Sequence, residues 1–197
     1  MTIRYSAESS TSWSPPQINS VLQCQQFISV PLAEIQPSPL EIREVLGNRS
    51  IESLSWDKLK GSVVIIDFWA TWCVPCIETI PHMNSLVEKY KDKPVVFISM
   101  TYEPNDLVLP FLIEHPIDAI RVLDIDFTTF QKYRAWAIPL VVIVDGNGVI
   151  SSRIHPDYLT EEVIDQLLVG TVPDLEQAPD DQFDPEGAEE YFRSLME

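Results

Sequence analysis

Three short runs of apolar residues stand out along the middle of the chain, at residues 63–68, 95–99 and 140–144. They are rich in β-branched residues and do not alternate with polar positions, which is typical of strands buried on both faces. A shorter run at 121–123 predicts one more strand. The last long run is followed by a turn sequence and a return strand at 149–154, which together form the clearest hairpin signal in the chain.

Between these runs the apolar residues recur at helical spacing. The predicted helices cover residues 73–90, 106–114 and 127–136, and a last one lies between Thr160, a favourable N-cap, and Gly170. Pro81 falls inside the first of them and predicts a kink. Ahead of the first apolar run, residues 40–55 favour two short strands, with a hairpin turn at Gly47-Asn48.

Helices therefore alternate with buried strands until a final hairpin and helix. This order predicts an α/β fold, a three-layer sandwich in which helices flank a mixed central β-sheet, with an N-terminal β extension. We expect three parts. These are an N-terminal extension and proline-punctuated linker at 1–39, the folded domain at 40–170, and an acidic tail at 171–197 with a short amphipathic helix near its end.

Composition and charge narrow the function. The 197 residues carry 13 Lys and Arg against 30 Asp and Glu, for a net charge of −17. Such a chain repels phosphate backbones and anionic lipid, so we expect no nucleic-acid partner. No apolar run is long enough to span a bilayer. Residues 1–16 lack the basic and apolar regions of a signal peptide, which favours either a cytoplasmic protein or a leader outside this sequence.

Candidate chemistry centres on the sequence Cys73-Val74-Pro75-Cys76. Because it follows a buried strand and opens a helix, Cys73 would face unpaired backbone N–H groups and the positive end of the helix dipole. Both favour the thiolate, which is the nucleophilic form of cysteine. We expect Cys76 to lie one turn later and deeper, placed to attack a mixed disulfide at Cys73. Pro75 suits the first helical turn because it needs no hydrogen bond there.

A zinc site or a purely structural disulfide would also use a cysteine pair. Zinc normally takes four ligands, and neither the lone third cysteine, Cys24, nor the histidines show ligand spacing around the pair. The loop between the two cysteines is too short for a crosslink to stabilise the fold much. Redox chemistry therefore explains the pair better, and we expect no metal and no other cofactor.

The segment from Asp67 to Cys76 resembles the active-site segment of thioredoxins, and residues 70–73 with 78–81 resemble TlpA-like thiol–disulfide oxidoreductases. The sequence Ala137-Ile138-Pro139, just before a buried strand, is similar to the cis-proline loop of that family. The resemblance covers about 40–170 and implies a thioredoxin-like fold. It also implies that Pro139 is cis and lies against the cysteines, and that Ile138 offers backbone groups to an extended substrate. Trp72 and Pro75 would belong to the substrate-binding surface.

Two acidic residues near the cysteines need separate treatment. Asp67 resembles the buried acid of thioredoxin, which assists proton transfer at the resolving cysteine, whereas many TlpA-like proteins have Asn there. Inside an apolar strand its charged form is desolvated, so we expect a raised pKa. Glu103 lies near a functional glutamate of some TlpA-like members, but its register differs, and we expect an exposed loop acid.

The resemblance implies a thiol–disulfide oxidoreductase that reduces or exchanges protein disulfides and draws electrons from an upstream thiol donor. Its catalytic residues would be Cys73, Cys76 and Asp67. A redoxin-type thiol peroxidase is an alternative, although Cys73 occupies the position where that class needs Thr. A non-catalytic copper chaperone is another, although that class separates its cysteines by three residues. TlpA-like proteins are usually extracytoplasmic, so the resemblance favours a periplasmic or membrane-anchored location, with the cytoplasm still open.

Overall fold

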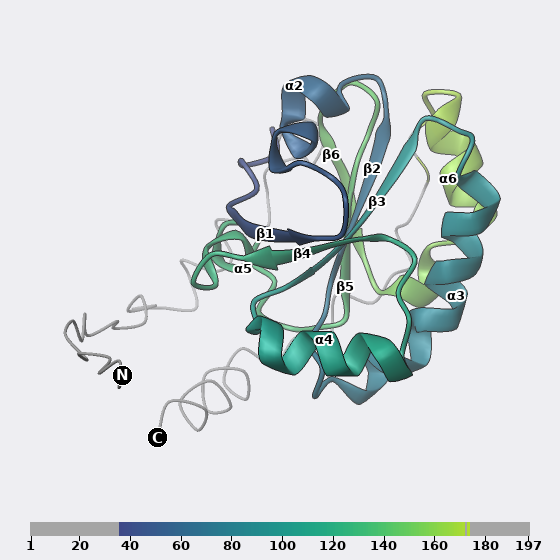
Figure 1. Ribbon diagram of the computed structural model, residues 1–197. Helices are drawn as coiled ribbons and strands as arrows, with labels where there is room; N and C mark the ends of the chain where they lie inside the picture. The colour runs from purple at the N-terminus through teal and green to yellow at the C-terminus, as the bar shows by residue number, and fades with distance from the viewer. Residues whose placement is uncertain (1–35, 172, 174–197) are drawn as a thin grey trace, which may run out of the picture. The chain divides into compact units, whose positions relative to one another are not determined.

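The computed structural model describes residues 36–171 and 173 (Figure 1). Cys24, most of the N-terminal extension and the expected amphipathic helix near the C-terminus lie outside the described residues.

The described residues form one mixed sheet with the strand order β1-β4-β3-β2-β5-β6. Its strands are β1 (Ile42–Leu46), β2 (Val63–Phe68), β3 (Val95–Thr101), β4 (Ile120–Asp124), β5 (Leu140–Val144) and β6 (Ile150–Ile154). The helical elements are η2 (Ile51–Leu54), α2 (Trp56–Leu59), α3 (Val74–Tyr90), α4 (Asn105–Glu114), α5 (Thr128–Lys132), η3 (Pro156–Tyr158) and α6 (Glu161–Leu168). None of these helices is both long and apolar enough to cross a membrane.

Helices cover both faces of the sheet, as expected of a three-layer sandwich (Figure 1). Successive strand residues point to opposite faces, so Ile65 packs in a core with α3, α4 and α6, while Ile66 packs in a second core with α2 and α5. The strands β2, β3 and β4 run parallel, and β1, β5 and β6 pair antiparallel to their neighbours. The carboxyl ends of β2 and β3 therefore meet at one edge of the sheet, where the cysteine motif begins.

The strongest sequence predictions are confirmed. The three apolar runs are the adjacent strands β3, β2 and β5 at the centre of the sheet. The strands β5 and β6 form the predicted hairpin, in whose turn the Asp145 carboxylate accepts hydrogen bonds from the N–H groups of Asn147 and Val149. Thr160 caps α6 by accepting a hydrogen bond from Val163 N–H, and Pro81 lies inside α3.

The predicted hairpin at residues 40–55 is wrong. Its first half is β1, which pairs antiparallel with β4 at the edge of the sheet. Its second half forms η2 and then α2, because Ser50 accepts a hydrogen bond from Glu52 N–H and starts a helical turn. The β extension therefore exists, but its partner strand is distant in sequence and no local turn signal could identify it.

The helix predicted at 127–136 is also shorter than expected. The backbone takes the left-handed conformation at Phe127 and again at Arg134, with φ of 63° and 51°, and α5 is confined between them. The Asp124 carboxylate fixes its start by accepting hydrogen bonds from Thr129 N–H at 2.8 Å and Phe130 N–H at 3.0 Å. The remaining residues form the irregular segment that leads to Pro139.

Candidate redox site

The cysteine pair lies where β2 ends and α3 begins. Cys73 is the N-cap residue of α3, and its Sγ accepts a hydrogen bond from Cys76 N–H at 3.3 Å. The two residues are joined by a disulfide, with their Cα atoms 5.2 Å apart. The motif therefore stands at the positive end of a seventeen-residue helix, as the sequence predicted.

The two cysteines are buried to the same extent, whereas the residues before and between them are exposed. Both are 3% exposed, so the expectation of a deeper Cys76 is wrong for the disulfide form. Trp72 and Val74 beside them are 43% and 63% exposed, and Pro75 is exposed as well. An exposed apolar collar around a redox pair is a surface suited to contact with another protein.

The loop before β5 has the backbone form that the resemblance implied. The Ile138–Pro139 peptide bond is cis, which confirms that prediction. Leu140 pairs with Phe68 in the antiparallel β5–β2 ladder, so Pro139 stands beside the end of β2 from which the chain continues to Cys73. Ile138 is partly buried and packs against both apolar cores.

Asp67 lies next to the end of β2, on the face of the sheet that α3 covers. Its Oδ1 is shielded from solvent and has no hydrogen-bond partner, although the residue as a whole keeps some exposure. Desolvation by burial raises the pKa of this carboxyl to about 7. The direction agrees with the sequence prediction. A carboxyl that titrates near neutrality can both take and return a proton at physiological pH.

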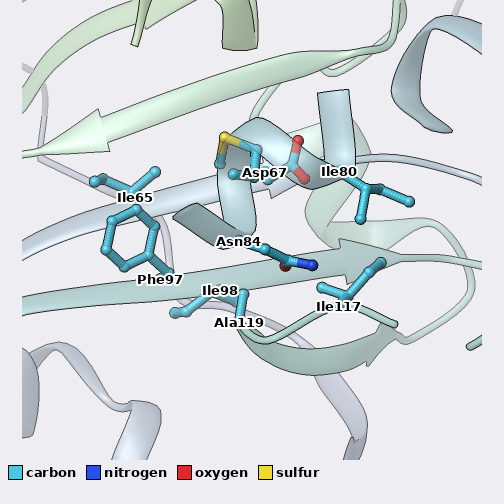
Figure 2. Close-up of a pocket in the computed structure, with 9 residues that line it drawn as sticks. Ile65, Asp67, Ile80, Asn84, Phe97, Ile98, Ile117 and Ala119 are labelled. Carbon is cyan, nitrogen blue, oxygen red and sulfur yellow. The ribbon is translucent and has the colours of Figure 1, made fainter. Parts of the chain in front are cut away.

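A cavity of about 10 Å³ borders Asp67 between α3 and the strands (Figure 2). Its walls are apolar apart from Asp67 and Asn84, and its volume is close to the minimum for one water molecule. Asn84 also fixes the segment before β4, which lines the same cavity through Ile117 and Ala119. The side chain donates to Pro116 O at 2.7 Å and accepts from Asp118 N–H at 2.9 Å. The Asp67 side chain therefore borders this small cavity on the α3 side of the sheet.

Glu103 is the site residue that the sequence analysis misjudged. It is only 5% exposed, and its carboxylate accepts hydrogen bonds from Thr71 N–H at 2.6 Å and Thr71 Oγ1 at 2.7 Å. Thr101 Oγ1 donates a further bond at 3.3 Å. Glu103 therefore anchors the loop that carries the cysteines. Thr71, which supplies two of these bonds, is 32 residues away along the chain, so the sequence around Glu103 gives no sign that the acid is buried with donors.

Other sequence-predicted features lie close to this loop. Trp72 Nε1 donates a hydrogen bond to Tyr102 Oη at 3.1 Å, which orients the indole beside the cysteines. Trp69 is buried in the core against the ring of Phe111. Over residues 36–171 and 173, no three His, Cys, Asp or Glu side chains are grouped so that they could hold a metal ion.

The curated relatives of this chain include proteins named thiol-disulfide oxidoreductase. It is 27% identical over 125 residues to the thiol-disulfide oxidoreductase ResA of Halalkalibacterium halodurans, covering 63% of this chain and 70% of ResA. It is 31% identical over 137 residues to the thioredoxin-like protein YneN of Bacillus subtilis, covering 60% of this chain and 74% of YneN. Of the ResA from Bacillus thuringiensis it spans 63%.

Solved structures agree on the fold. A thiol-disulfide isomerase from Corynebacterium glutamicum superposes with a TM-score of 0.56 at 20% identity, covering 70% of this chain and 96% of the other. The fold, the cysteine pair and these relatives define a thioredoxin-fold, TlpA-like thiol–disulfide oxidoreductase. Residues 38–168 match the Redoxin family, and the chain belongs to that family.

Proposed function

We propose that this protein reduces disulfides in extended protein segments, with Cys73 as the attacking cysteine and Cys76 as the resolving one. The observation that carries the proposal is the Cys73–Cys76 pair at the N-terminus of α3. The backbone N–H that bonds Cys73 Sγ in the disulfide is also available to stabilise a thiolate at that atom. Cys76 lies within the first turn of the helix, three residues after the N-cap Cys73, where it can attack a mixed disulfide at Cys73.

The reaction balances without a cofactor. The Cys73 thiolate attacks one sulfur of the substrate disulfide, and the other sulfur leaves as a thiolate. The Cys76 thiol then gives its proton to Asp67, and the resulting thiolate attacks Cys73 Sγ. The mixed disulfide breaks, the second substrate sulfur leaves as a thiolate, and the Cys73–Cys76 disulfide forms. The two substrate thiolates take up protons from Asp67 and from solvent, so the product is a dithiol. An upstream dithiol donor returns two electrons to the pair and completes the cycle.

The substrate surface follows from the same geometry. Trp72, Val74 and Pro75 supply exposed apolar contact area beside the sulfurs. Ile138 lies just ahead of the cis peptide bond, where its backbone can pair with an extended segment in the manner of strand addition. Both surfaces lie near the end of β2, because Leu140, two residues after Ile138, pairs with Phe68. Together they favour a substrate disulfide in an extended polypeptide segment over one in a small molecule.

Single cysteine variants test the assignment of roles, using insulin as the protein disulfide, dithiothreitol as the donor and a Cys24→Ser background to remove the third thiol. Cys73→Ser should lose insulin reduction by roughly 100-fold or more, because no nucleophile remains. Cys76→Ser should accumulate the mixed disulfide, because nothing resolves it. Ser85→Ala, an exposed change on the same helix, is the control. Equal trapping by both cysteine variants would contradict the roles.

The same proteins separate the proposal from its two alternatives. A thiol peroxidase would reduce hydrogen peroxide at least as fast as it reduces insulin in the presence of the donor. A copper chaperone would bind Cu(I) tightly through the reduced pair and show little insulin reduction. Disulfide exchange predicts fast insulin reduction with slow peroxide turnover.

A further inference from the structure

Three buried polar atoms without hydrogen-bond partners share one line across the sheet. Asp67 Oδ1, Ser99 Oγ and Arg121 Nε are all shielded from solvent and unpaired. The two other atoms of this kind among the described residues, in Trp69 and Asn105, lie outside the strands. Each such group costs stability, so their alignment calls for a functional explanation.

Strand register places the three side chains side by side. Asp67 stands opposite Ser99 in the parallel β2–β3 ladder, and Ser99 stands opposite Arg121 in the β3–β4 ladder. Residues opposite one another point to the same face of the sheet, which here is the face under α3. Neighbouring strands lie about 4.8 Å apart, so the backbone of Ser99 adjoins that of Asp67 and the backbone of Arg121 follows at about 10 Å.

The surroundings leave Asp67 few other partners. Val141 of β5 stands opposite it on the far side, and Leu46 ends the line beyond Arg121. From α3, Ile80, Met83 and Asn84 line the adjoining cavity. Among the described residues of this line and cavity, Arg121 is the one charged side chain besides Asp67.

We propose that Ser99 is a positioning residue for Asp67 and donates its hydroxyl hydrogen to the ionised Asp67 carboxylate, and that the charge of Arg121 on β4, beyond Ser99, supports that ionised state. The inference rests on the proposed role of Asp67 in resolution. Ser99 is 1% exposed and its hydroxyl has no partner in the structure, so it is an uncommitted donor in register with Asp67. Arg121 is held by bonds from its terminal nitrogens to Ile117 O and Leu46 O, which keeps its charge fixed.

This arrangement matters for the resolving step. Asp67 accepts the Cys76 proton only if its carboxylate is ionised first, and the apolar surroundings oppose ionisation. A hydrogen bond from Ser99 favours the charged form, and it can be released when the proton arrives. The Cys76 S–H bond breaks, the Asp67 O–H bond forms, and the Cys76 thiolate attacks the mixed disulfide. The proposed role of Ser99 is therefore to set the pH range in which the Asp67 carboxylate is ionised and can accept the Cys76 proton.

The direct test is a carbon-13 NMR titration of the Asp67 carboxyl in the oxidised full chain. Ser99→Ala should raise the midpoint by about half to one pH unit, because the donor to the charged form is lost. Ser99→Thr, which keeps the hydroxyl, should restore the wild-type midpoint. Arg121→Gln should raise it by less, and Arg121→Lys should leave it nearly unchanged. Ser152→Ala, a buried serine of β6, is the matched control.

A merely structural serine would change unfolding and leave the midpoint where it is. A Ser99→Ala midpoint equal to that of wild type, or below it, would overturn the inference. The proposed function is tested separately by the pH dependence of single-turnover resolution in wild type and Asp67→Asn. Loss of the acidic limb in Asp67→Asn supports the role of Asp67, and its persistence contradicts that role without affecting the NMR result.

Discussion

Two acidic side chains near the cysteine loop differ in how their carboxylates are hydrogen-bonded. The Glu103 carboxylate is saturated by hydrogen bonds from Thr71 and Thr101. Asp67 has an oxygen with no partner. Charge-assisted bonds offset the cost of burying an acid, so Glu103 stabilises the loop. Asp67 carries an uncompensated cost, which is characteristic of a residue retained for chemistry.

The cost at Asp67 predicts a pH-dependent stability. Its pKa is raised to about 7 in the folded protein from 3.8, so the folded state binds this proton more tightly than the unfolded chain. The stability that this group contributes is present below about pH 4 and is lost as the pH rises to about 7. Asp67→Asn has no such loss. Its advantage over wild type in the free energy of unfolding should therefore grow by roughly 2–3 kcal/mol between about pH 5 and pH 8.

Urea denaturation of the oxidised proteins at several pH values measures this difference, with the exposed Asp92→Asn as the control. If Asp67→Asn were less stable than wild type at neutral pH, Asp67 would be a structural hydrogen-bonding residue and the relay would have to be abandoned.

Glu103 predicts a different response. Glu103→Ala leaves the N–H and hydroxyl of Thr71 without their acceptor and should cost about 1–3 kcal/mol of stability. It should also slow insulin reduction more than reduction of a small aromatic disulfide, because the loop bearing Trp72 is no longer held. Glu103→Gln keeps an acceptor oxygen and should lose less. Thermal unfolding and the two rates check this, with the exposed Glu114→Ala for comparison; equal slowing of both substrates would argue against a positioning role.

How far the sequence predicts these residues depends on whether the partners are local. Cys73, Cys76 and Asp67 belong to one strand–loop–helix segment, so their placement follows from neighbouring residues. The environment of Glu103 depends on Thr71, which is 32 residues away, and spacing along the chain carries no sign of it. The row through Ser99 and Arg121 likewise appears only once strand register is known.

Among the elements, the central strands were predictable and the boundaries of the edge elements were not. A strand buried on both faces has a continuous apolar signature, so β2, β3 and β5 stand out. The edge strand β1 pairs with β4 across a long sequence separation, and α5 is ended by backbone conformation at Arg134. Tertiary contacts decide such elements more than local propensity does.

The short helix α5 supplies a prediction at this scale. The fully buried Asp124 carboxylate accepts bonds from two N–H groups at its start. Asp124→Ala removes both acceptors and should cost about 2 kcal/mol of stability. Disulfide exchange per folded molecule should persist, because Asp124 is not part of the redox site. Denaturation and active-site titration measure the two effects, with the exposed Asp118→Ala as the control. A loss of exchange in fully folded Asp124→Ala would place α5 within the substrate site.

At the scale of the whole molecule, the described residues contain everything the proposed reaction uses. Both apolar cores, the sheet and the disulfide lie within residues 36–171. We propose that the domain begins before residue 40, the boundary expected from sequence. Ser38 O accepts hydrogen bonds from Trp56 Nε1 at 2.8 Å and from Tyr133 Oη at 2.5 Å, so the linker residue completes the core around α2 and α5.

A chain of residues 36–173 should therefore fold alone and reduce a small aromatic disulfide within about twofold of the full-length rate. A matched chain that begins at residue 40 keeps every site residue but removes the acceptor for Trp56 and Tyr133, and it should be less stable by about 1–3 kcal/mol. Circular dichroism and urea denaturation measure folding, and the exchange rate measures the site. If the 36–173 chain gave a native spectrum but lost exchange, residues beyond it would contribute to the site and the domain boundary proposed here would be wrong. If the two truncated chains were equally stable, the hydrogen bonds to Ser38 would not be what secures the start of the domain.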